Sequence, residues 1–94
     1  MELEWDESKR RANIDKHGLD FLDAKHLDWD DAAYIEDLRF PYPESRFCAF
    51  AMWKARLYVV AFCIRGQKVR LISFRKANPK EVKRYGQKKE TKHP

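Results

Sequence analysis

The sequence contains no apolar run long enough to span a membrane, and it does not open with the basic segment that begins a secretory signal peptide. Residues 1–6 are acidic instead. We therefore expect a cytoplasmic protein with no membrane partner. Only two cysteines are present, Cys48 and Cys63, each inside an apolar run and without the spacing of zinc ligands. We expect both to be buried free thiols, with a disulfide left open, and we expect neither a metal nor a cofactor.

The second half of the chain is poor in acidic residues. Residues 46–94 hold 14 Lys/Arg against only Glu81 and Glu90, whereas residues 1–45 hold 6 Lys/Arg against 13 Asp/Glu. The net charge is therefore +12 in the second half and −7 in the first, although the whole chain carries only +5. This division favours a polyanionic partner that carries phosphate. An alternative remains open, in which many of the cations solvate strand edges and a helix face.

The length of 94 residues is that of one domain, and an apolar content of 44% is enough to build a modest core. We predict an α+β fold in which N-terminal helices and a C-terminal helix pack on an antiparallel β-sheet. This single small domain is expected to occupy residues 1–86. Residues 87–94 are polar and basic, with nothing to bury, and are predicted to form a flexible tail.

Capping residues and apolar alternation indicate the order of the elements. Asp6 and Gly18 are typical of the start and end of a helix, and Asn78-Pro79 with Glu81 is a strong start for the last one. The predicted helices are 7–16, 21–25 and 79–85, and the predicted strands are 1–5, 33–38, 45–53, 56–65 and 68–75.

A two-residue turn at Gly66-Gln67 sets the register of the last hairpin. Counting from this turn, Phe62 faces Leu71 and Val60 faces Ser73. One face becomes a core face of apolar residues, namely Tyr58, Val60, Phe62, Ile64, Val69 and Leu71. The other face brings together the cations Arg65, Lys68 and Arg70, which suggests an anion between them. The alternative is a salt bridge from Arg65 or Arg70 to the acidic N-terminal half.

Three sets of residues follow one another along the chain: Trp5-Asp6…Lys9…Asn13…Lys16-His17-Gly18…Phe21, then Glu44-x-Arg46, then Leu57-Tyr-Val-Val-Ala…Arg65…Val69-Arg70-Leu-Ile-Ser73-Phe-Arg75-Lys76-Ala77…Glu81…Tyr85. In this order and at this spacing, these motifs resemble those of the BrnT toxins of bacterial type II toxin–antitoxin systems. The resemblance covers roughly residues 4–85. The sequence departs from the family where Glu7 replaces the usual proline and where a glycine common after the central strand is absent.

The resemblance implies a compact domain like that of the RelE ribonucleases. It also implies a growth-inhibiting, metal-independent endoribonuclease that cleaves RNA and is neutralised by a cognate antitoxin, similar to BrnA. Such an antitoxin usually binds DNA and represses the shared operon, so that operator DNA would be reached only through the antitoxin.

Metal-independent RNA cleavage uses the ribose 2′-OH as the nucleophile, so the protein has to accept a proton and stabilise charge on phosphorus. Arginine suits the second task because its planar fork binds two phosphate oxygens. The predicted catalytic residues are Glu44, Arg46, Arg65 and Arg75. The predicted RNA-binding residues are Lys68, Arg70, Lys76, Lys80, Lys83 and Arg84.

The general base is open at this stage. Glu44 is a candidate, but an ion pair with Arg46 accounts for it equally well. His17 titrates near neutrality, although its place at a helix end favours a structural role. Tyr85 is a possible acid whose helical spacing from Val82 favours packing.

Two further functions stay open. The first is a non-catalytic nucleic-acid-binding or regulatory module with the same fold. The second makes the basic face a docking surface for an acidic antitoxin.

Overall fold

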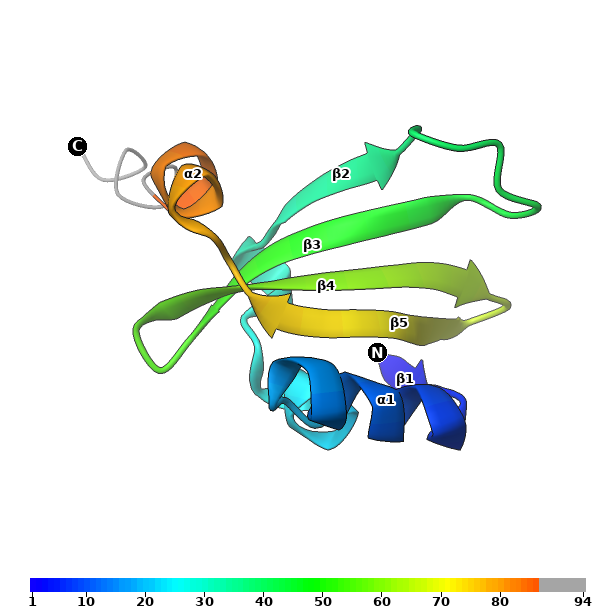
Figure 1. Ribbon diagram of the computed structural model, residues 1–94. Helices are drawn as coiled ribbons and strands as arrows, with labels where there is room; N and C mark the ends of the chain where they lie inside the picture. Colours follow the sequence, from blue (N-terminus) through cyan, green and yellow to red (C-terminus); the bar gives the residue numbers. More distant parts are fainter. Residues whose placement is uncertain (87–94) are drawn as a thin grey trace.

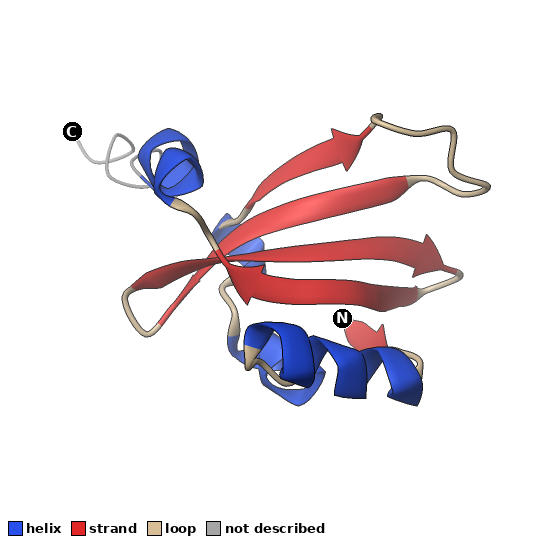
Figure 2. Cartoon of the chain, viewed as in Figure 1, coloured by secondary structure: helices blue, strands red, loops and turns tan. Residues whose placement is uncertain are grey.

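The computed structural model describes residues 1–86, so the tail predicted at residues 87–94 lies outside the described residues. The elements are β1 (Glu2–Glu4), α1 (Glu7–His17), η1 (Phe21–His26), η2 (Trp29–Asp31), β2 (Ala33–Asp37), β3 (Arg46–Trp53), β4 (Arg56–Arg65), β5 (Lys68–Lys76), α2 (Pro79–Glu81) and η3 (Val82–Gly86). Helices and strands thus follow the predicted order, and the α+β class is confirmed (Figures 1 and 2).

The five strands form one sheet in the order β1-β5-β4-β3-β2. The strands from β2 to β5 are joined as antiparallel neighbours, whereas β1 runs parallel to β5. The sheet is therefore mixed rather than wholly antiparallel. Parallel neighbours need a long crossover connection. The helices and three other strands, which lie between β1 and β5 in the chain, provide it.

Helix α1 completes the edge of β5 where β1 ends. The pairing of β1 with β5 covers only residues 68–70. Beyond it, the side-chain amide of Asn13 donates to Phe74 O at 2.9 Å and accepts from Phe74 N at 2.9 Å. Asn13 is the buried residue of α1, whereas its apolar neighbours Ala12 and Ile14 are exposed. The side chain of Asn13 thus makes the two backbone hydrogen bonds that a longer β1 would make with β5 at Phe74.

Each face of the sheet carries its own core. On the first face, η1 and η2 pack over side chains from β3, β4 and β5, with Phe21, Val60 and Phe74 fully buried. On the second face, a smaller cluster of Ala33, Phe50, Leu57 and Val59 is packed against Ala77 and against Tyr85 of η3. Within residues 1–86, no helix lies over the rest of this face toward the β4–β5 turn (Figure 1).

A β-bulge in the last hairpin changes the predicted register. The pairs from Arg65–Lys68 to Phe62–Leu71 are confirmed, but the predicted pair Val60–Ser73 is wrong. A register shift beyond Phe62 pairs Val60 with Phe74 and Val59 with Arg75. Without it, Arg75 would lie on the core face, because one residue of slip reverses the side of every side chain. The bulge therefore moves Arg75 to the second face.

Candidate active site

The second face of the sheet gathers arginines from three neighbouring strands. Alternation along the strands places Arg46 of β3, Arg65 of β4, and Arg70 and Arg75 of β5 on this face. Between them lie the small side chains of Cys48, Ala61, Cys63 and Ser73. Both cysteines are free thiols as expected, but only Cys63 is buried, whereas Cys48 is half-buried; desolvation raises the pKa of Cys48. The surface between the arginines is therefore shallow, and guanidinium groups, which stay positively charged, flank it.

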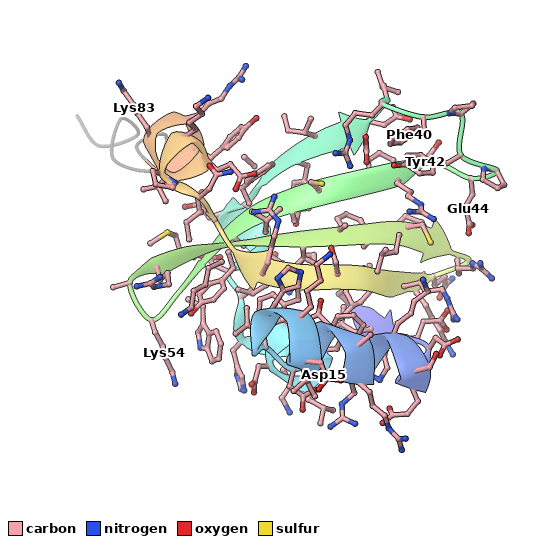
Figure 3. All side chains as sticks on the ribbon, in the orientation of Figure 1. Asp15, Phe40, Tyr42, Glu44, Lys54 and Lys83 are labelled. Carbon is pink, nitrogen blue, oxygen red and sulfur yellow. The ribbon has the colours of Figure 1, made fainter. Side chains whose placement is uncertain are left out.

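The predicted catalytic residues Glu44 and Arg65 are in direct contact. Glu44 Oε1 accepts a hydrogen bond from Arg65 Nη2 at 2.9 Å, and both side chains are about half exposed. The ion pair between Glu44 and Arg46, considered as an alternative from the sequence, is therefore replaced by one with Arg65. This contact raises the pKa of Arg65 above its ordinary value, so the guanidinium stays charged. Glu44 lies in the loop before β3, at one end of the sheet (Figure 3).

The other two cations of the β4–β5 turn also have acidic partners. Arg70 Nη1 donates to Glu4 Oε2 at 3.0 Å, and Lys68 Nζ lies 3.5 Å from Glu2 Oε2. Both carboxylates come from β1, which the parallel pairing places beside these residues. The salt bridges to the acidic N-terminal half, considered as an alternative from the sequence, are thus formed by Arg65 and Arg70 alike.

Arg46 is held differently from the other arginines. Its guanidinium lies 4.2 Å from the centre of the Tyr42 ring, and within residues 1–86 it has no carboxylate at ion-pair distance. The Tyr42 hydroxyl donates to Asp37 at 3.1 Å, and Asp37 accepts two hydrogen bonds from the Arg39 guanidinium and one from the Arg39 backbone N–H. These bonds hold the pKa of Asp37 well below its usual range. Among the described residues, the N–H donors of Arg46 are therefore free, while the Tyr42 ring beneath its guanidinium is fixed.

Sequence reasoning missed Asp37 and Arg39 as supports of the site. The signal was present, because an acid and an arginine two residues apart lie immediately before the proline-rich loop. One face of the Tyr42 ring is covered by the Arg46 guanidinium, and the Tyr42 and Phe40 rings meet edge to face with 5.8 Å between their centres.

Arg75 lies apart from the Glu44–Arg65 pair. It pairs across the sheet with Val59, six residues before Arg65 along β4, which corresponds to roughly 20 Å. Its guanidinium donates to both carboxylate oxygens of Glu81 at 2.8 and 2.9 Å. Glu81 also closes the capping box with Asn78 that the sequence predicted. Arg75 thus fastens the last helix to the sheet, and the predicted catalytic residues fall into two groups.

The remaining candidates lie near α2 or at the end of α1. Lys76, Lys80, Lys83 and Arg84 are exposed and have no carboxylate partner within residues 1–86. Tyr85 stacks on Phe50 with 3.9 Å between ring centres, which agrees with packing. Burial, followed by Lys16 and Arg75, lowers the pKa of His17. The adjacent Gly18 ends α1 in the left-handed conformation and bonds to Ile14 O at 2.8 Å.

Residues 1–86 contain neither a metal-binding cluster nor a membrane-spanning helix. No three His, Cys, Asp or Glu side chains of this part of the chain gather as a metal-binding group. No helix within it is long and apolar enough to cross a membrane.

Comparison with known proteins identifies the family. The family model described as the ribonuclease toxin BrnT of type II toxin–antitoxin systems matches residues 5–81. The 1.1 Å crystal structure of the Brucella abortus ribonuclease toxin BrnT is 33% identical, covers 83% of this chain and 97% of that chain, and superimposes with a TM-score of 0.65. Among curated protein sequences none matches. The chain therefore belongs to the BrnT family of ribonuclease toxins of type II toxin–antitoxin systems.

Proposed function

We propose that this toxin is an endoribonuclease that cleaves RNA without a metal ion, by attack of the ribose 2′-OH on the adjacent phosphate. The observation that carries the proposal is the Glu44–Arg65 pair, in which a carboxylate and a guanidinium are held 2.9 Å apart on an open face. A carboxylate is a proton acceptor and a guanidinium a charge-stabilising donor, and this reaction needs both within one phosphate's reach.

In the proposed reaction, Glu44 accepts the 2′-OH proton and the 2′-oxygen attacks phosphorus. Arg65 and Arg46 donate to the phosphate oxygens that gain charge, since both arginines project from the same face of neighbouring strands. The 5′-oxygen leaves and takes a proton from water. The products are a 2′,3′-cyclic phosphate and a 5′-hydroxyl. Arg70 and Lys68 hold flanking phosphates in exchange for Glu4 and Glu2.

Arg75 takes a secondary part in this proposal. It lies roughly 20 Å from Arg65 along the sheet and already uses two donors on Glu81. We assign it a phosphate further along the RNA, beyond the cleaved bond, and a role in holding α2. In the cell, the toxin is proposed to act in the cytoplasm and to be neutralised by a BrnA-like, DNA-binding antitoxin that alone contacts the operator.

Purified protein incubated with single-stranded RNA and excess EDTA tests the chemistry. We expect fragments that end in 2′,3′-cyclic phosphate, and we expect Glu44→Gln to lower their rate of formation about 100-fold. Arg11→Ala is the matched control, because this exposed arginine of α1 lies outside the site. Cleavage that requires a divalent cation, or that leaves 5′-phosphates, would contradict the mechanism. RNA binding by folded protein without any cleavage would support the non-catalytic module instead.

A further inference from the structure

A second surface lies at the other end of the sheet, between the β3–β4 hairpin and the last helix. A groove of about 870 Å³ is lined there by Met52, Ala55, Arg56, Leu57, Ala77, Pro79, Val82, Lys83 and Gly86. We refer to these residues as the α2 groove. Figure 3 shows that Lys54 and Lys83 lie at this end, whereas Glu44 lies at the opposite end. The groove is therefore separate from the proposed cleavage site.

The walls of the α2 groove are fixed by contacts already described. The Arg75–Glu81 pair and the stacking of Tyr85 on Phe50 hold α2 and η3 to the sheet. The hairpin wall is made by β3 and β4, which pair up to Trp53 and Arg56. The groove is therefore a preformed feature of the fold.

The charge at this end is positive and uncompensated. Arg56 and Lys83 line the groove, and neither has a carboxylate within ion-pair distance among residues 1–86. The same holds for four further cations of the β3–β4 turn, the end of β5 and the last helix, namely Lys54, Lys76, Lys80 and Arg84. Such a site attracts an anionic partner.

The lining shows which kind of anion fits. Apart from the two cations, the groove presents aliphatic side chains and a glycine, and Val82 is 45% exposed there. None of the lining residues is aromatic. Unpaired RNA bases are held by aromatic stacking and by hydrogen bonds to their edges, which this lining lacks. An amphipathic peptide with aliphatic side chains toward the floor and carboxylates toward Arg56 and Lys83 matches it.

We propose that the α2 groove is an antitoxin-docking site that binds an acidic, aliphatic segment of the partner, away from the cleavage site. This rests on the toxin–antitoxin partnership of the family and not on the cleavage chemistry. The chain's own continuation is a poor occupant by charge, since residues 87–94 contain three lysines and one glutamate. The assignment also gives the cations of the last helix a protein ligand in place of RNA.

The test is a titration of isotope-labelled protein, followed through its amide NMR spectrum. The probe is a synthetic amphipathic peptide of leucine and glutamate, about 14 residues long. We expect it to shift the amide signals of Ala55, Arg56, Val82 and Lys83. The double variant Arg56→Glu/Lys83→Glu should weaken binding at least about 10-fold. The control Lys9→Glu/Lys16→Glu makes the same charge change at exposed positions of α1 and should bind as the wild type does.

Two further variants separate the contributions. Val82→Ser keeps the charge and should weaken the peptide several-fold if the aliphatic floor is used. Arg65→Ala should bind the peptide normally even if it no longer cleaves RNA, so that failure of the cleavage mechanism and failure of this proposal are distinct results.

Four outcomes would overturn the proposal. The first is that the peptide shifts no groove amide, and the second is that the α1 control loses as much affinity as the groove variant. The third is that a single-stranded oligouridylate of about 12 nucleotides shifts the same amides and displaces the peptide, which would make the groove an RNA site. Concentration-dependent changes of these signals without any peptide would show that a second copy of the chain occupies the groove.

Discussion

The two ends of the sheet hold cations in opposite ways. At the β4–β5 turn, Arg65, Lys68 and Arg70 each lie within 4.0 Å of a carboxylate. At the α2 end, Arg56 and Lys83 have no such partner within residues 1–86. A cation that is already paired with a carboxylate of the protein binds an external anion only by releasing that carboxylate. This exchange favours a ligand that contacts several of the cations at once. An uncompensated cation attracts any acidic surface. Net charge alone does not distinguish these two situations.

The largest expected effect compares one cation from each end. Arg65→Ala should lower RNA cleavage by purified protein about 100-fold, because it removes a donor to the charge that develops on phosphorus. Lys80→Ala, in the last helix and outside the α2 groove lining, should change the rate by less than about 3-fold. Initial rates on one labelled RNA at fixed salt provide the measurement.

The contrast between the two ends of the sheet would be contradicted if Arg65→Ala and Lys80→Ala lowered the cleavage rate by the same factor. Equal losses would mean that RNA lies along the whole basic face, as the sequence alone suggested. A loss confined to Lys80→Ala would move the site to the α2 end. Circular dichroism of each variant shows that the domain remains folded.

The next effect concerns stability and contrasts the two arginine–glutamate pairs. Arg75→Ala should lower the melting temperature by about 5–10 °C, because Glu81 is only 18% exposed and loses two charge-assisted hydrogen bonds. Arg65→Ala should leave the melting temperature nearly unchanged, because its pair with Glu44 is half exposed and screened. Thermal unfolding followed by circular dichroism decides between them. Similar shifts in both variants would show that exposure does not separate the pairs.

A smaller effect appears when pH removes the charge of Glu81. The Arg75 guanidinium, more than any other group, lowers the pKa of Glu81 below its ordinary value of 4.5. The folded state therefore releases this proton more readily than the unfolded state. The stability from the pair is present above about pH 4.5 and is lost as the pH falls through the folded-state pKa.

The measurement is the difference in melting temperature between wild type and Glu81→Gln. This difference should be full at pH 7 and fall to less than about half at pH 3. Other carboxylates also lose hydrogen bonds in acid, but they do so in both proteins and cancel in the difference. A constant difference across this range would mean that the charge of Glu81 is not what stabilises the protein at this position.

The fold was predictable wherever a local signal marks it. The turn at Gly66-Gln67 gave the correct register as far as Phe62, and the cap at Asn78 gave the start of the last helix. The bulge was not predictable, because Ile72 and Ser73 satisfy either register with no turn residue between them. This error matters for function, since the bulge decides the face on which Arg75 lies.

The ion pairs of the site were predictable only as a class. Thirteen carboxylates in the first half made salt bridges to the basic half an evident alternative. Which carboxylate meets which arginine depends on the parallel placement of β1 beside β5 and on the path of the loop before β3. The role of Asn13 is also non-local, because it follows from where β1 stops.

The smallest effect compares the two hairpin turns. The β3–β4 turn holds two non-glycine residues at positive φ, Lys54 at 51° and Ala55 at 59°, whereas the β4–β5 turn uses Gly66 at 60°. Ala55→Gly should stabilise the protein by about 0.5–1 kcal/mol, because it relieves left-handed strain at more than the entropic cost of glycine. Gly66→Ala should destabilise it by about 1 kcal/mol. Since nothing lies within 4 Å of a Cβ added at Gly66, that loss would arise from backbone conformation alone. Urea unfolding of both variants measures the two values. If Ala55→Gly destabilises the domain instead, the alanine methyl contributes more to the α2 groove wall than its backbone strain costs.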